Sequence, residues 1–159
     1  MVLTQKEKFL LQDQKSQEEL CVKKYNNYAI QAQDQQLKQL FTQHAQKEQQ
    51  HLDTLNQILN GQVPNVNQQQ SQQTQQTAQT QSAQTQTSGQ SGMTSQNDAD
   101  LCNDMLTTEK HVSGAYNTAI FEFRDHNIRQ VLNHIQKEEQ EHGESIFKYM
   151  ESKGMYQPQ

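Results

Sequence analysis

A Glu-x-x-His motif occurs twice in this chain and could supply metal ligands. Glu48 and His51 form the first copy, and Glu139 and His142 form the second. Residues three apart lie on the same face of a helix, so both side chains of a pair could reach one ion. Carboxylate oxygens and imidazole nitrogens together suit iron or manganese. One copy alone would be weak evidence, because the motif arises readily in glutamate-rich helices.

The two copies belong to a longer internal repeat. Residues 10–59 align without a gap onto residues 101–150 at an offset of 91, with ten identities in fifty positions. Most of the identical residues are not glutamine, so the biased composition does not account for them. Apolar positions coincide as well, for example Leu37 with Ile128. The chain therefore contains two related units.

Each unit has the pattern of a helical hairpin. Apolar residues recur every three or four positions in stretches rich in good helix formers, and strand-like alternation is absent. Four helices are predicted, at residues 5–32, 36–60, 100–124 and 127–152. Polar turns are predicted at residues 33–35 and 124–126. A single hairpin cannot bury its apolar face, so we expect the two to pack as one all-α four-helix bundle.

Such a bundle would bring acidic residues from all four helices to one height. Glu18 lies 16 residues before the turn residue Asp34, and Glu48 lies 14 residues after it. The second hairpin repeats both distances from its own turn with Glu109 and Glu139. At a rise of about 1.5 Å per residue, the two carboxylates of each hairpin differ by about 3 Å in height. The glutamates are therefore expected near the middle of the bundle.

This arrangement is the ligand set of a dinuclear carboxylate site, in which two helices give one Glu each and two give Glu-x-x-His. The predicted metal ligands are Glu18, Glu48, His51, Glu109, Glu139 and His142. The predicted cofactor is a pair of iron or manganese ions. Without metal, four buried carboxylates would raise their pKa values or turn outward. No catalytic residue is predicted.

Some neighbouring residues have two interpretations. Tyr25 and Tyr116 either hydrogen-bond ligand carboxylates or are ordinary core aromatics, and the second interpretation is slightly preferred. Adjacent glutamates also leave open that part of the acidic set is solvated surface charge; these neighbours are Glu19, Glu138 and Glu141. The remaining histidines are expected at the surface or in the core rather than on metal; they are His44, His111, His126 and His134.

The two cysteines, Cys21 and Cys102, could form one bridge or remain free thiols, and no chemistry is assigned to either.

Composition divides the 159-residue chain into three parts. Between Gly61 and Asn97 there is no charged residue, and Gln, Thr, Ser and Asn make up nearly all of the segment. Such a segment cannot bury enough apolar surface to offset the entropy of ordering, so we expect disorder. The predicted organisation is a first hairpin at residues 1–60, a disordered linker at 61–97 and a second hairpin at 98–159. Both hairpins would form one bundle.

Composition also excludes several classes of protein. The formal charge is −5 and no basic stripe is present, which argues against nucleic acid as a partner. No apolar run approaches the roughly 20 residues that span a bilayer, so membrane insertion is not expected. The N-terminus lacks an uninterrupted apolar core after a basic head, so a cleaved secretion signal is not expected.

The second hairpin carries several segments that together resemble a known family. Residues 115–120 read Ala-Tyr-Asn-Thr-Ala-Ile, and the last helix closes on Lys-Gly-Met-Tyr at residues 153–156. With Glu109-Lys110, Ile128-Arg129 and the Glu139–His142 motif, this stretch resembles the coat F family of bacterial spore coat proteins. The resemblance is weaker over the first hairpin and does not include the linker.

The resemblance implies a ferritin-like bundle placed in or beneath the coat of endospores of Bacillus- or Clostridium-like bacteria. Members of the family are generally regarded as structural, without an assigned reaction. More distant ferritin-like proteins, such as rubrerythrins and manganese catalases, use the matching carboxylate and histidine positions for metal.

The expected function is therefore a structural component of the spore coat, made in the mother-cell cytoplasm, with a dinuclear metal site in its core. The alternative is a diiron or dimanganese redox protein housed in the coat, which removes peroxide or oxidises ferrous iron. Other coat proteins are the expected partners, and the sequence is also compatible with a homodimer.

Overall fold

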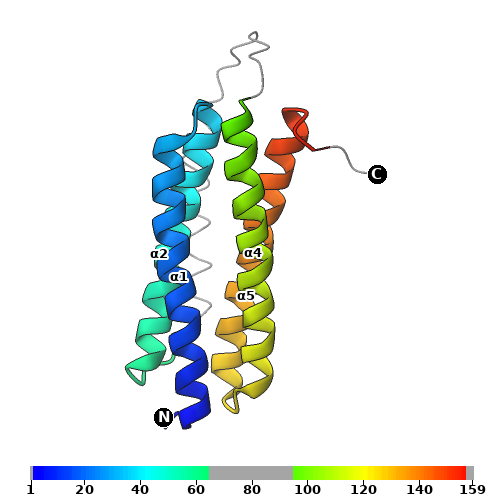
Figure 1. Ribbon diagram of the computed structural model, residues 1–159. Coiled ribbons are helices and arrows are strands. Elements are labelled where there is room, and N and C mark those ends of the chain that lie inside the picture. The colour runs from blue at the N-terminus through cyan, green and yellow to red at the C-terminus, as the bar shows by residue number, and fades with distance from the viewer. Residues whose placement is uncertain (1, 65–94, 157–159) are drawn as a thin grey trace, which may run out of the picture.

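The computed structural model describes residues 2–64 and 95–156, and within these residues it contains four α-helices and no strand (Figure 1). The helices are α1 (Gln5–Gln31), α2 (Gln35–Leu59), α4 (Gln96–Glu122) and α5 (His126–Ser152). The all-α prediction is confirmed for this part of the chain. Helix α4 begins four residues before the predicted residue 100, because Ser95 provides an N-cap there.

All four helices start at a side chain that accepts backbone N–H groups, and these caps are Thr4, Asp34, Ser95 and Asp125. The Asp34 carboxylate accepts hydrogen bonds from the N–H groups of Gln36 and Leu37 at 2.7 and 3.1 Å. Asp125 accepts in the same way from the two N–H groups at the start of α5. The predicted turns at residues 33–35 and 124–126 therefore coincide with the ends of the helices.

The helices pack as a bundle in which α1 pairs with α2 and α4 pairs with α5. Helix α1 also lies against α4, and α2 lies against α5. Followed along the chain in Figure 1, α1 runs up, α2 and α4 both run down, and α5 runs up again. The end of α2 and the start of α4 therefore lie at opposite ends of the bundle. Residues 65–94, most of the predicted disordered linker, lie outside the described residues.

Carboxylates at the starts of two helices fix the hairpins to each other. At one end, Asp98 accepts hydrogen bonds from the N–H groups of Gln33 and Asp34 at 2.8 and 2.9 Å. At the other end, Glu7 accepts a hydrogen bond from the N–H of Arg124 at 3.0 Å. Glu7 and Asp98 are also 91 residues apart, so the two contacts occupy equivalent positions in the two hairpins.

The apolar core consists of two clusters, one in each half of the bundle. Leu11, Leu55, Val112 and Leu132 belong to the first cluster. Leu37, Phe41, Met105 and Ile146 belong to the second. Both cysteines are buried free thiols, one in each cluster, so the sequence alternative of a bridge does not occur. None of the described helices is long and apolar enough to cross a membrane.

We expect Glu7→Gln to lower the free energy of unfolding at pH 7 by about 2 kcal/mol, the usual effect of a lost cap plus a charged hydrogen bond. Burial raises the pKa of Glu7, but hydrogen bonds from Arg124 and Thr4 outweigh it and lower the pKa to about 2. The stabilisation is therefore full above the unfolded pKa near 4.5 and disappears as the pH falls toward 2. Urea unfolding of both proteins between pH 7 and pH 3 measures this difference. The exposed Glu19→Gln is the control; a pH-independent difference would contradict the prediction.

Candidate metal centre

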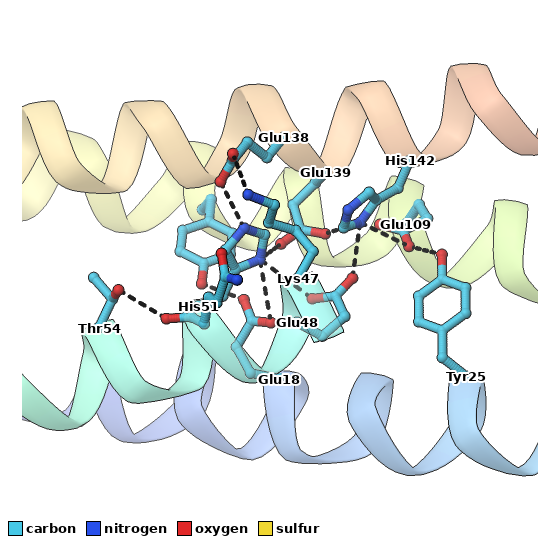
Figure 2. A network of polar contacts seen from close by, with 12 residues as sticks. Glu18, Tyr25, Lys47, Glu48, His51, Thr54, Glu109, Glu138, Glu139 and His142 are labelled. Carbon is cyan, nitrogen blue, oxygen red and sulfur yellow. Dashed lines mark hydrogen bonds and ion pairs between the residues drawn. The ribbon is translucent and has the colours of Figure 1, made fainter. Parts of the chain in front are cut away.

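The six residues predicted from the sequence as metal ligands lie together in the middle of the bundle (Figure 2). Glu18 comes from α1, and Glu109 comes from α4. The two Glu-x-x-His motifs come from α2 and α5. All six side chains are buried, and none of the four glutamates is more than 2% exposed. The polar layer that they form separates the two apolar clusters.

The six residues form two overlapping groups, each with one ligand atom per residue and all of these atoms within 4.8 Å of one another. The first group is Glu18, Glu48, His51 and Glu139. The second group is Glu48, Glu109, Glu139 and His142. Glu48 and Glu139 belong to both groups. Each group thus has one imidazole, one carboxylate of its own and two shared carboxylates, which is the donor set of two adjacent metal positions.

Both histidines direct the Nδ1 atom toward the carboxylates. His51 Nδ1 lies 2.9 Å from Glu139 Oε1 and 3.3 Å from Glu48 Oε2. His142 Nδ1 lies 2.9 Å from Glu48 Oε1 and 3.6 Å from Glu109 Oε1. The same nitrogen of each ring therefore faces the centre, and Nε2 is left for other contacts.

Glu18 and Glu109 each belong to one group only and are called the unshared glutamates. Each of them accepts a hydrogen bond from a tyrosine on a helix of the other hairpin. The hydroxyl of Tyr25 on α1 donates to Oε1 of Glu109 on α4. The hydroxyl of Tyr116 on α4 donates to Oε1 of Glu18 on α1. Both tyrosines are fully buried, so they are core aromatics and hydrogen-bond donors at once. The sequence preference for a core role alone was therefore too narrow.

Burial raises the pKa values of both unshared glutamates. Burial raises the pKa of Glu18 well above its usual range, and the negative charge of Glu139 raises it further. Burial is also the main cause that raises the pKa of Glu109 to about 8. Both carboxyl groups therefore tend to hold a proton at neutral pH in the metal-free protein.

The pKa values of the shared glutamates, Glu48 and Glu139, are lowered instead, because the two imidazoles lie beside them. Burial raises the pKa of Glu48, but hydrogen bonds from His142 and His51 outweigh it and hold the pKa well below the usual range. Burial lowers the pKa of both histidines, but the surrounding carboxylates outweigh it and raise both pKa values well above the usual range. Glu139 also has a lowered pKa, because His51 and His142 outweigh its burial and the charge of Glu48. Two imidazolium cations thus balance two buried carboxylates.

Three residues beside the centre were not predicted to take part in it. Glu138 Oε2 lies 2.9 Å from His51 Nε2, and Lys47 Nζ lies 3.1 Å from the other oxygen of Glu138. On the opposite side, the ring of His44 stacks on His142 with a centroid distance of 4.3 Å. The sequence signal for Glu138 was its place between Ile135 and His142 at helical spacing, which puts it on the buried stripe.

The other histidines lie where the sequence placed them, at the surface or in the core. His111 and His126 are exposed, His134 is half-buried and His44 is buried. Of the neighbouring glutamates, Glu19 and Glu141 are exposed and Glu138 is buried, and the six predicted ligands are all buried. The solvated-charge alternative therefore does not describe the six.

Comparison with known proteins agrees with the sequence resemblance over the second hairpin. Residues 97–159 match the family model of the Coat F domain. Over 63 residues the chain is 35% identical to the uncharacterised protein YusN of Bacillus subtilis; this match covers 40% of the present chain and 57% of YusN. The chain therefore matches little more than half the length of this relative. No solved structure gives a significant match. Over residues 97–159 the chain is therefore similar to the Coat F domain.

Proposed function

We propose that this chain is a structural component of the endospore coat whose ferritin-like bundle is held together by a dinuclear metal centre. The Coat F match supports the structural role. The ferritin-like assignment is supported by the order of helix directions, in which α2 and α4 run parallel (Figure 1). The proposal that the hairpins are copies of one unit is supported by the contacts that recur at an offset of 91, above all the crossed pairs of tyrosine and glutamate.

We infer from the two groups of ligand atoms how the six residues would share two ions. Glu48 and Glu139 would bridge both ions, since each belongs to both groups of ligand atoms. Glu18 and His51 would complete one position. Glu109 and His142 would complete the other. Two ions of iron or manganese would cross-link all four helices and would supply redox capacity.

Carboxyl oxygens without hydrogen-bond partners support the fit of these residues to a metal ion. Oε1 of Glu18 and of Glu109 each accept a tyrosine hydroxyl. Oε2 of both residues is buried and has no hydrogen-bond partner among the described residues. A buried carboxyl oxygen without a hydrogen-bond partner is costly whether the group is protonated or ionised, and a bound cation would remove that cost. This observation carries the metal proposal.

Metal analysis of the purified full chain tests the proposal. After incubation with Mn²⁺ or Fe²⁺ and removal of excess metal, we expect two equivalents per chain by mass spectrometry of the metal. Fewer than half an equivalent under both conditions would reject the centre. Fractionation of purified spores tests the structural role, because a coat component should be found in the coat extract and be absent from the core.

The complete set of six ligands also supports a second candidate, a diiron or dimanganese redox protein housed in the coat. Peroxide consumption by the metal-loaded protein separates the two. A structural protein should consume peroxide no faster than the same concentration of free metal ion. A redox protein should consume it at least about tenfold faster and lose this activity in Glu48→Ala.

We expect Glu138→Gln to weaken binding of the ion nearer to His51 by roughly ten- to a hundredfold, because a carboxylate on the outer nitrogen orients a metal-binding imidazole. Binding of the ion nearer to His142 should stay unchanged, since no such carboxylate contacts His142 Nε2 among the described contacts. Calorimetric titration with Mn²⁺ resolves the two steps. Glu141→Gln, an exposed change on the same helix, is the control. Equal weakening of both steps would contradict the prediction.

A further inference from the structure

An open groove of about 650 Å³ runs between α4 and α5 and reaches the metal centre. Glu109 and Glu139, one unshared and one shared ligand, form part of its lining. The rest of the lining is mixed in character and includes Leu106, Lys110, Asn117, Gln140, Glu144 and Phe147. The groove therefore brings solvent against two of the six candidate ligands, while Glu109 Oε2 and both carboxylate oxygens of Glu139 stay buried.

Two glycines keep this side of the bundle open. Gly114 on α4 and Gly143 on α5 both line the groove. A Cβ atom added at Gly143 would lie 4.0 Å from the Cβ of Glu109, so the missing side chain leaves space directly over this ligand. In the first hairpin, the positions at an offset of 91 hold Lys23 and Leu52. The first hairpin therefore carries side chains at the two positions where the second hairpin has none.

Among the four glutamates of the centre, only Glu109 retains any exposure, while His51 and His142, which do not line the groove, retain 2% and 6%. Glu18, Glu48 and Glu139 are fully buried, whereas Glu109 retains 2% exposure. Glu109, which lines the groove, is also one of the residues whose Oε2 atom is buried and has no hydrogen-bond partner among the described residues. At the outer rim, Glu144 is exposed and forms an ion pair with Lys148 at 2.5 Å, so an approaching divalent cation would compete with Lys148 for this carboxylate.

We propose that the groove between α4 and α5 is the route by which divalent metal ions enter and leave the centre. The ion meets Glu144 at the rim, passes Gly143 and is received by Glu109, from which it reaches the shared carboxylates. This inference rests on the proposed metal centre, and it adds that exchange takes place through one hairpin only.

Closing the groove tests the route. The variant Gly143→Leu, made in the full chain, introduces the leucine that the first hairpin has at the equivalent position, Leu52. The Cβ atom of the new side chain would lie 4.0 Å from the Cβ of Glu109, so it fits without a clash. We expect the rate of Co²⁺ uptake, followed by stopped-flow absorption, to fall at least tenfold, while the final stoichiometry stays at two. Gly143→Ala, which adds only that first carbon, should change the rate by less than threefold.

A charge reversal at the rim gives a second test that does not touch the core. Glu144→Lys should slow Co²⁺ uptake about threefold at low ionic strength, and the difference should vanish in about 1 M salt, because screening removes steering of the cation. Glu141→Lys is the matched control, since Glu141 is an exposed carboxylate on the same helix outside the lining of the groove. Its uptake rate should equal that of the unaltered protein.

The outcomes separate the route from the centre. If the unaltered protein binds no Co²⁺, the centre and the route both fail. If it binds two equivalents and neither Gly143→Leu nor Glu144→Lys slows uptake, the centre stands and the route is wrong. If Gly143→Leu lowers the stoichiometry by disturbing Glu109, the route is tested by the two rim variants alone. Slower uptake in Glu144→Lys than in Glu141→Lys supports the route, and equal rates reject it.

Discussion

Glu48→Gln is expected to abolish binding of both metal ions, whereas Glu18→Gln is expected to remove only one. Glu48 belongs to both groups of ligand atoms, and its two oxygens lie within 3.3 Å of the two inward-facing imidazole nitrogens. Glu18 belongs to one group. An amide cannot carry the negative charge that a bridging ligand supplies, so we expect affinity for both ions to fall by at least about a hundredfold.

Equilibrium dialysis against Mn²⁺ followed by metal analysis measures both stoichiometries. The unaltered protein should hold two equivalents, Glu18→Gln one and Glu48→Gln none. Glu19→Gln changes the exposed neighbour of Glu18 and should leave two equivalents in place. Circular dichroism of each variant controls for folding. Loss of a single ion in Glu48→Gln would show that this carboxylate does not bridge.

Loading with metal should raise the free energy of unfolding by about 4 kcal/mol for each ion when the free metal concentration is a thousand times the dissociation constant. The reason is that binding requires the folded bundle, since the ligands come from four helices. A further contribution comes from the buried carboxyl oxygens, which lack hydrogen-bond donors without metal.

Thermal and urea unfolding with Mn²⁺ and with a chelator measure this effect. Glu48→Gln serves as the control, because it should unfold at the same point under both conditions. A shift of equal size in Glu48→Gln would mean that metal binds elsewhere on the protein. No shift in the unaltered protein would reject a metal centre with a stabilising role.

The helical spacing of the apolar residues and the number of residues between each glutamate and its turn were sufficient to predict the bundle and its central polar layer. The apolar stripes gave four helices whose observed bounds differ from the prediction by at most four residues. Equal distances from Asp34 and Asp125 placed the glutamates at one height, because helical rise is constant. The distances are comparable in the two hairpins because both turns are short, at residues 32–34 and 123–125.

The sequence could not predict which of several adjacent acidic residues point inward. Glu138 and Glu139 are consecutive and differ by about 100° around the helix axis, yet both are buried. The outcome depends on how far α2 and α5 approach each other and on Lys47, which pairs with Glu138 from the facing helix. Such packing distances are not encoded in the spacing of one helix.

The sequence also could not predict which carboxylates Tyr25 and Tyr116 contact. Tyr25 follows Glu18 by seven residues, which suggests a contact within one helix. A long helical side chain leans toward the N-terminus of its own helix, and α1 lies against the antiparallel α4. The hydroxyl therefore arrives at the height of the carboxylates but beside Glu109, on the neighbouring helix.

This crossing links docking of the hairpins to the affinity of the proposed metal centre. Neither hairpin contains a whole group of candidate ligands, since each group takes residues from both and each unshared glutamate is held by a tyrosine from the other. A substitution far from the centre that loosens the fit of one hairpin on the other, such as at Asp98 or Glu7, would therefore appear in a titration as a loss of metal affinity. Two separated hairpins would behave as non-binding halves that regain the site only as a pair.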